Sequence, residues 1–277
     1  MGFRIATNPT SLSAQRQLEN TTRNLATTLD KLSSGSRINK AADDSAGLAI
    51  SEKLKAQIRS LGQAKRNAND GISLVQTAEA AMNEIANSLI RMRELSIQAA
   101  SDTVGQDERS FINIEIQQIK SEIQRISETT EFNGTPLLKG DEANLSIQIG
   151  PHNKEGLDNI VYSGRETGSD LLALGIEEVQ TIDRDGSKMN LAQLDNALIK
   201  LNGNRARLGA LQNRLQSAVT SLNVSTENLS RANSNIRDTD VAGETSELAK
   251  QQILSQSGIA VLAQANALPK AALQLLA

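Results

Sequence analysis

Side chains able to do chemistry are few in this chain, and their spacing does not assemble a site. His152 is the only histidine and there is no cysteine, so a Ser-His-Asp triad would depend on a histidine in the turn-like segment GPHNKEG, and the two-histidine motif of zinc proteases cannot form. Glu177 with Glu178 and Asp183 with Asp185 could bind a hard cation, but no EF-hand spacing accompanies them, and we interpret them as solvated surface charge. The sequence therefore predicts no catalytic residue, no cofactor and no metal site.

The composition favours a helical interaction protein over an enzyme. Among 277 residues the aromatic ones are three phenylalanines and one tyrosine, and there is no tryptophan. Because large aromatics usually dominate globular cores and ligand sites, we expect Leu, Ile, Val and Ala to be buried along long helical seams. A net charge of −3, with lysine and arginine scattered among acids, offers no basic stripe for phosphates and argues against nucleic acid as a partner.

The first half of the chain predicts three helices. Residues 18–32 carry apolar residues at heptad spacing, and a serine–glycine break follows. Acids and serine at 43–45 supply N-cap oxygens for a helix that runs to about Ala99, roughly 80 Å at 1.5 Å per residue. Thr103 with Gln106 has the spacing of a capping box, which predicts a third helix that folds back along the second.

In the middle of the chain the spacing of apolar residues changes from helical to strand-like. Asn133 with Gly134 forms a turn signal, and alternation over 145–149 predicts a strand whose hairpin partner is Ile160–Tyr162. The glycine-containing stretch 163–188 is interpreted as turns and short elements. The β region therefore spans about 140–185.

The clearest periodicity lies in the second half of the chain. Six apolar residues recur every seven positions and predict a bundle seam: Leu201, Leu208, Leu215, Leu222, Leu229 and Ile236. Asn190 with Gln193 offers an N-cap, and the pattern stops near Asp238 and Asp240. We expect this helix to pack against the two long helices of the first half in an antiparallel bundle about 60 Å long.

The last segment is apolar on every face. From Gln251 onward Lys270 is the only charged residue, yet glutamine, serine and proline interrupt the apolar run, which falls short of the about 18 uninterrupted apolar residues of a membrane span. A helix that is apolar all round must be buried on all sides, and we expect neighbouring copies of the chain to bury it. The residues predicted to form this self-assembly core are Leu18, Leu25, Leu29, Leu32, Leu254, Ile259, Leu262, Leu268, Leu273 and Leu276.

Four segments in this order resemble the bacterial flagellins. They are LSSGSRINKAADDSAGLAI (residues 32–50), IRMRELSIQ (90–98), TEFNGTPLL (130–138) and the C-terminal stretch from RANSNIRDTD to the end (231–277). The resemblance implies a structural subunit that polymerises into the extracellular flagellar filament for motility. It also implies a mainly α fold, in which terminal helices at 1–42 and 239–277 pair as a coiled coil and form an inner core, while 43–238 forms an outer-core helical bundle.

The resemblance implies partners as well. The start of the chain lacks the plan of a cleaved secretory signal, and the family's type III export would use residues 1–32 together with a chaperone bound at 248–277. Filament cap and hook-junction proteins would be further partners. Positions matching the family's contact residues for Toll-like receptor 5 are Arg91, Leu95 and Glu115, and the i, i+4 spacing of the first two predicts an exposed edge that packs against the next subunit.

Three alternatives remain open at this stage. A hook-filament junction protein resembles flagellin at its ends but forms a short ring. A soluble coiled-coil adaptor would explain the heptads but would leave the C-terminal helix unburied, and an enzyme is the remaining class. Glycosylation of Ser163, Thr167, Ser169 or Thr181 would require these positions to be exposed, and residue type alone is weak evidence for it.

Overall fold

The computed structural model describes residues 7–140, 144–152, 154 and 156–274. Its chain divides into two compact units: a terminal unit made of residues 1–56 with 228–277, and a bundle unit made of residues 57–227. We describe each unit by itself.

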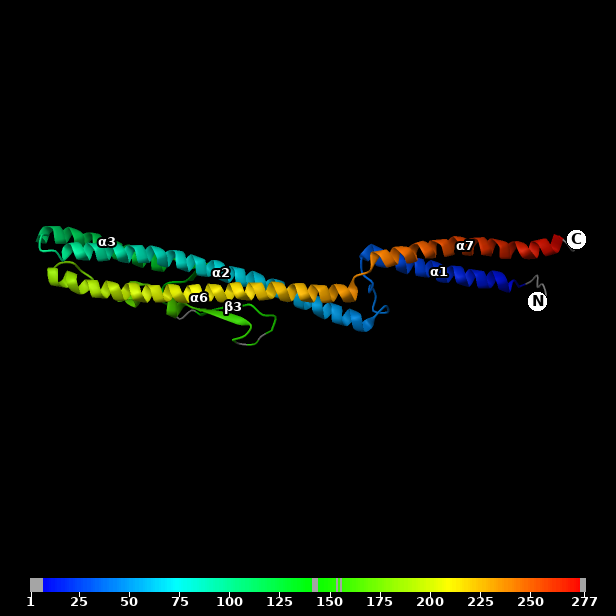
Figure 1. Cartoon of the computed structure of the whole chain (residues 1–277), viewed down its shortest axis with the longest axis horizontal. Coiled ribbons are helices and arrows are strands. Elements are labelled where there is room, and N and C mark those ends of the chain that lie inside the picture. Colours follow the sequence, from blue (N-terminus) through cyan, green and yellow to red (C-terminus); the bar gives the residue numbers. More distant parts are fainter. Residues whose placement is uncertain (1–6, 141–143, 153, 155, 275–277) are drawn as a thin grey trace. The chain divides into compact units, whose positions relative to one another are not determined.

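Two antiparallel helices, α1 (Pro9–Ser34) and α7 (Val241–Gln274), lie side by side in the terminal unit (Figure 1). The side chain of Asn8 caps α1 by accepting a hydrogen bond from the Ser11 amide, and the same side chain donates to the Ala265 carbonyl near the other end of the chain, at 2.7 Å. Gly35 ends α1 in the left-handed conformation, with φ of 66°, which confirms the predicted break. The terminal helices therefore pair, as the sequence predicts.

The start of α2 (Ser45–Ala99) is capped by one of the two predicted acids. Asp44 Oδ1 accepts a hydrogen bond from the Gly47 amide at 2.8 Å, as an N-cap should. The Asp43 carboxylate instead accepts from the Asn39 and Lys40 amides in the preceding loop, and these bonds hold its pKa below the usual value. α2 ends at the predicted residue.

The capping box predicted before α3 (Gln106–Thr129) is wrong. Gly105 occupies the N-cap position, and Thr103 forms a hydrogen bond with Ser101 instead of reaching the helix. The connection between α2 and α3 is instead stabilised by Arg109 of α3. Its guanidinium donates to the carbonyls of Ala99 and Ser101 at 2.9 and 3.0 Å. Ala99 is the last residue of α2, so its carbonyl has no partner inside the helix, whereas Ser101 lies beyond the helix and its carbonyl also accepts from the Val104 amide. The arginine therefore stabilises the end of α2, and the start of α3 has no side-chain cap.

Two short hairpins follow. Strands β1 (Glu131–Phe132) and β2 (Thr135–Pro136) are joined through Asn133 and Gly134, both at positive φ (51° and 77°), as an Asn-Gly hairpin turn requires. Strands β3 (Asn144–Gln148) and β4 (Asn159–Ser163) pair antiparallel, with Ile147 opposite Ile160. The predicted strand and its partner are confirmed.

The remaining elements are α4 (Gly164–Thr167), α5 (Leu171–Leu174) and α6 (Arg184–Arg237). The predicted N-cap of the last helix is wrong, because Asn190 lies inside α6. Its side chain donates to the Gln180 carbonyl at 2.6 Å, in the connecting segment before the helix. An asparagine can form such a bond from a helix interior as well as from a cap, so the spacing alone misplaced the start.

The bundle unit is built around one core to which α2, α3, α6 and the small β region contribute. Its largest buried side chains include Met82, Ile85, Leu89, Met92, Ile116, Ile123, Leu137, Leu138 and Tyr162. α2 and α6 run antiparallel in this unit, as the Arg93–Asp195 ion pair at 2.7 Å indicates. The predicted seam runs through this core as far as Leu222, whereas Leu229 and Ile236 are half-buried in the terminal unit.

Candidate assembly surface

The side chains buried between α1 and α7 are small or polar. Thr21 and Thr28 on α1 and Gln251 and Ala265 on α7 are each at most 6% exposed. The Gln251 amide donates to the Glu247 carboxylate at 2.6 Å. The two buried threonines are seven residues apart, about two turns of the helix. The most deeply buried side chains between the two helices are therefore small or polar, and the leucines of this contact are only half-buried.

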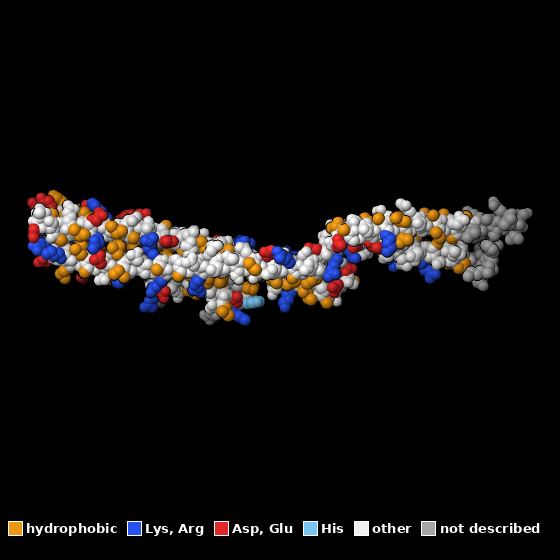
Figure 2. Space-filling view, viewed as in Figure 1, with side chains coloured by type: hydrophobic (Ala, Val, Ile, Leu, Met, Phe, Trp, Pro, Cys, Tyr) orange, Lys and Arg blue, Asp and Glu red, His pale blue; other side chains and the backbone are white. Residues whose placement is uncertain are grey.

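Large apolar side chains point away from this seam. Figure 2 shows hydrophobic side chains on the outer surface of the terminal pair. On the described part of the pair the exposed ones are Leu12, Leu29, Val241, Ile253, Leu254, Ile259 and Val261. Ile253 and Ile259 remain 63% and 56% exposed. Apolar area left in water costs roughly 25 cal/mol per Å² relative to burial, so this surface favours association.

The residues predicted for the self-assembly core fall into three groups. Leu18, Leu25, Leu32 and Leu262 are half-buried by the α1–α7 contact, and Leu29, Leu254 and Ile259 are exposed. Leu276 lies outside the described residues, as do the side chains of Leu268 and Leu273. No described helix is long and apolar enough to cross a membrane.

A second predicted surface lies on the bundle unit, where α2 meets α3. The Arg91 guanidinium bonds to Glu115 Oε1 at 2.8 Å and to Glu94 Oε2 at 3.2 Å, and these two acids raise the pKa of Arg91. Arg91 and Glu115 are exposed, but Leu95 is 2% exposed and belongs to the core. The predicted exposed edge is therefore wrong for Leu95, because the i, i+4 face of this helix turns inward within one turn of Arg91.

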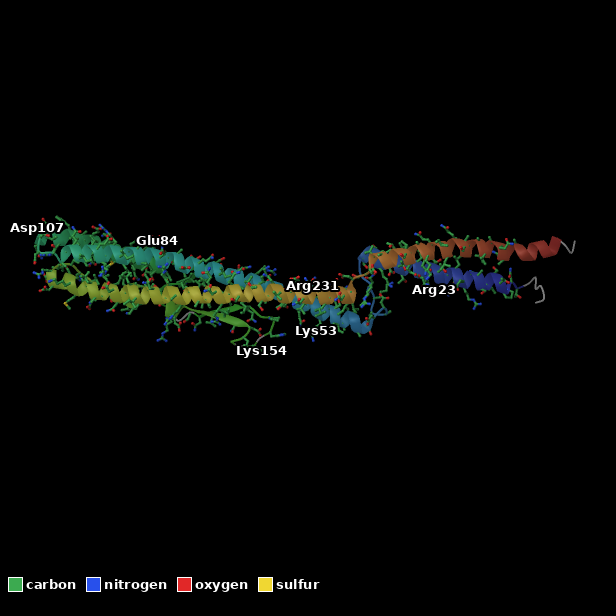
Figure 3. The ribbon with its side chains drawn as sticks, in the orientation of Figure 1. Arg23, Lys53, Glu84, Asp107, Lys154 and Arg231 are labelled. Carbon is green, nitrogen blue, oxygen red and sulfur yellow. The ribbon has the colours of Figure 1, made fainter. Side chains whose placement is uncertain are left out.

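The side chains predicted to be solvated are exposed: His152, Glu177, Glu178, Asp183 and Asp185. In the part of the chain that the structure describes, no group of three histidines, cysteines or acids could hold a metal ion. Figure 3 shows other charged side chains projecting outward, among them Arg23 on α1 and Glu84 on α2.

Three of the four hydroxyl residues considered for glycosylation are buried. Thr167, Ser169 and Thr181 are 4%, 0% and 0% exposed, and Ser163 is half-buried. Thr167 Oγ1 donates to the Tyr162 hydroxyl at 2.8 Å, and that hydroxyl donates to the Leu137 carbonyl at 2.6 Å. Hydroxyl residues in a turn-rich stretch are usually exposed, but here Thr167 and Ser169 bond to carbonyls inside the unit, and Thr181 Oγ1 is buried without a hydrogen-bond partner.

Polar residues buried in the bundle unit were missed by the sequence analysis. Lys120 on α3 is 7% exposed and donates to the carbonyls of Glu177 and Val179. Ser127 on the same helix is fully buried and donates to the Leu138 carbonyl at 3.1 Å. A signal was present, because both positions interrupt the apolar face of α3 at helical spacing.

Comparison with known proteins covers nearly the whole chain. Two family models match, one described as the bacterial flagellin N-terminal helical region over residues 5–143 and one as the bacterial flagellin C-terminal helical region over residues 191–276. A flagellin of Halalkalibacterium halodurans is 43% identical over 248 residues, which cover 90% of either chain. A flagellar filament 33 kDa core protein of Treponema phagedenis is 42% identical over 97% of this chain and 98% of its own.

A solved structure agrees with these sequence matches. The crystal structure of Bacillus cereus flagellin superposes with a TM-score of 0.51 at 30% sequence identity, over 57% of this chain and 88% of that one. The matched models leave residues 144–190 uncovered, the stretch that holds the β3–β4 hairpin and the connection to α6.

Proposed function

Because the chain belongs to the bacterial flagellin family and is a structural subunit that polymerises into the extracellular flagellar filament, we propose that its two units divide the work of assembly. The terminal helices, residues 1–42 and 239–277, form the inner core of the filament. Residues 43–238 form the outer core, and the filament they build serves motility.

The exposed apolar surface of the α1–α7 pair carries this proposal. Ile253, Ile259 and Val261 are more than half exposed in the single chain, and a stable soluble helix would instead turn such residues toward a core. In a filament, neighbouring copies cover this surface through heterologous contacts, so burial of the apolar area exposed in the monomer drives assembly.

The same surface supports proposals about the path to the filament. Before export, a chaperone at residues 248–277 would cover α7 and prevent premature association, because this segment combines exposed apolar side chains with almost no charge. Residues 1–32 would guide the unfolded chain through type III export, and the filament cap and the hook-junction proteins would meet the assembled ends. These assignments follow the family.

Recognition by Toll-like receptor 5 is a further proposal for the bundle unit. The exposed, ion-paired Arg91 and Glu115 are the residues that a receptor can reach in the single chain. Leu95 would support that surface from beneath, because its side chain packs in the core. Binding would then depend on the ion pair between Arg91 and Glu115, because each of these side chains restricts the position of the other.

Seeded assembly tests the proposal. Purified monomer is mixed with short filament fragments, and the critical concentration is measured by sedimentation and checked by negative-stain electron microscopy. Ile259→Asp should raise the critical concentration by about 10-fold or more, because an unpaired carboxylate costs several kcal/mol when it is buried. Far-ultraviolet circular dichroism of the monomer should not change, since Ile259 is 56% exposed there.

Ile259→Val is the matched control, since it keeps an apolar side chain of nearly the same shape and should assemble like the parent. If Ile259→Asp assembles normally, α7 is not buried in the filament and the proposed division is wrong. Short rings from the parent chain would point to a junction protein instead.

A further inference from the structure

The connection between β4 and α6 takes the place of a fourth helix in the bundle unit. Residues 166–182, here named the strap, contain the end of α4 and the single turn of α5, and otherwise lack regular structure. Leu174, Ile176 and Val179 of the strap are each at most 2% exposed and belong to the core. A non-helical segment buried in this way must find partners for its own amides and carbonyls.

One face of α3 supplies many of these partners. Five polar residues on α3 follow one another at spacings of seven, four, three and four, which places them on a single helical face. Gln106, Gln117 and Lys120 donate to the strap carbonyls of Ile182 (3.0 Å), Val179 (3.4 Å) and Glu177; Asn113 and Gln124 accept from the amides of Thr181 (3.1 Å) and Leu171 (3.4 Å). The strap therefore runs antiparallel to α3 and is bonded through its backbone.

A face of α6 holds the first half of the strap in the same manner. Lys200, Asn204 and Arg207, at i, i+4 and i+7, each donate to a strap carbonyl. Their acceptors are Ala173 at 3.3 Å, Gly168 at 3.1 Å and Glu166 at 3.3 Å, respectively. These three residues therefore hold the strap through its backbone carbonyls.

Lys120 is the fourth of the five residues on this face of α3. It is the one charged side chain in the described residues that is less than 9% exposed, and its ammonium group bonds to two strap carbonyls. Burial lowers the pKa of Lys120, while Glu177 acts in the opposite direction. A buried ammonium is tolerated only while such acceptors remain in place, so the strap and Lys120 depend on each other.

We propose that the strap is a latch that opens as one piece, leaving α3 while α2, α3 and α6 remain packed, and that Lys120 sets how often it opens. In the described residues one backbone bond, from the Ser169 amide to the Leu138 carbonyl, joins the strap to another element, and no continuous ladder of backbone bonds holds it. The strap is otherwise attached by three apolar anchors and by side chain–backbone bonds that contribute about 1 kcal/mol each. Thr181 Oγ1 is buried without a hydrogen-bond partner, which leaves the end of the strap incompletely satisfied. Segments of this kind open by local unfolding, which costs less free energy than unfolding the whole protein.

Hydrogen exchange on the full-length monomer, followed by mass spectrometry, tests this latch. In the parent chain, peptides covering 171–182 should exchange together and faster than peptides from α2 or α6. Lys120→Met keeps the apolar stem and removes the donors, and it should speed exchange in 171–182 by about 10-fold with little change in α2 and α6.

Arg125→Met is the matched control, because Arg125 lies on the same helix, is exposed and bonds to Glu122 on its own helix. It should leave exchange in the strap unchanged. Asn113→Leu, at the other end of the α3 face, provides a second variant if Lys120→Met does not fold, and it should speed exchange around Thr181. An equal rise in all helices, or no rise in the strap, would overturn the proposal.

Discussion

In the bundle unit Met82, Ile116 and Leu201 are fully buried, whereas in the terminal unit Ile253 and Ile259 are more than half exposed. Both units are built from long antiparallel helices with apolar residues at helical spacing, so the pattern alone does not separate them. The difference is the number of neighbours, because several packed elements enclose a core and a pair of helices cannot. We therefore expect the bundle unit to be stable within one chain and the terminal pair to need other copies.

Truncating one leucine in each unit should give the largest difference in the free energy of unfolding between the two units. Leu201→Ala removes a fully buried side chain and should lower the free energy of unfolding by about 2–5 kcal/mol. Leu29→Ala, at 48% exposure, should cost less than about 1 kcal/mol in the monomer. Urea unfolding can be followed for the bundle unit by the fluorescence of Tyr162, the only tyrosine, and for all helices by circular dichroism. Equal losses at the two positions would contradict the comparison.

Replacing one glycine by alanine in each unit should change stability by a smaller amount, with opposite signs in the two units. A Cβ on Gly168 would lie 2.8 Å from the Cα of Gly140, and backbone cannot move aside cheaply, so Gly168→Ala should destabilise the bundle unit by about 1–3 kcal/mol. A Cβ on Gly258 of α7 would meet the half-buried Leu18 side chain at 3.3 Å. That side chain can turn aside, so Gly258→Ala should stabilise α7 by up to about 1 kcal/mol through helix propensity.

The temperatures of thermal unfolding of these two variants, measured beside the parent, provide the check. Gly62→Ala serves as a control within α2, because nothing lies within 4 Å of a Cβ built there. A stabilised Gly168→Ala would mean that the close approach to Gly140 is relaxed in solution.

The smallest expected effect is a pH dependence confined to the bundle unit. Burial raises the pKa of Tyr162 above its ordinary value of 10.0, and the bond from Thr167 offsets part of that rise. Because the folded-state pKa is raised, the stabilisation is complete below pH 10.0 and is lost as pH rises through the folded-state value. Tyrosinate absorbance should therefore appear later than in a denatured control, and Tyr162→Phe should flatten the alkaline loss of bundle stability. Titration at the ordinary pKa would show that Tyr162 is accessible to water.

Much of the architecture could be predicted from the sequence. The heptads from Leu201 to Leu222, the end of α2 at Ala99 and the β3–β4 hairpin follow from residue spacing, because helix and strand periods are local properties of the chain. Helix starts were less predictable. Thr103 and Asn190 had cap-like spacings but bond elsewhere, since several short polar side chains compete for the same backbone groups.

The candidate surfaces were predicted with mixed success. The apolar exterior of α7 follows from composition, and Arg91 on the predicted edge is exposed. The ion pair of Arg91 with Glu115 was not predicted. The inward turn of Leu95 and the burial of Thr167 were not predicted, because they depend on which element packs against each face. No local pattern specifies that neighbour.

The sequence by itself determined the helical periods, the turn at Asn133, the family, and the excess of apolar side chains at the C-terminal end. Only the tertiary structure decided that a non-helical strap completes the bundle and that Lys120 is buried beneath it. The physical reason is the range of the interactions. Periodicity and turn preference arise within a few residues, whereas the cost of burying Lys120 is offset by carbonyls that lie more than fifty residues away along the chain.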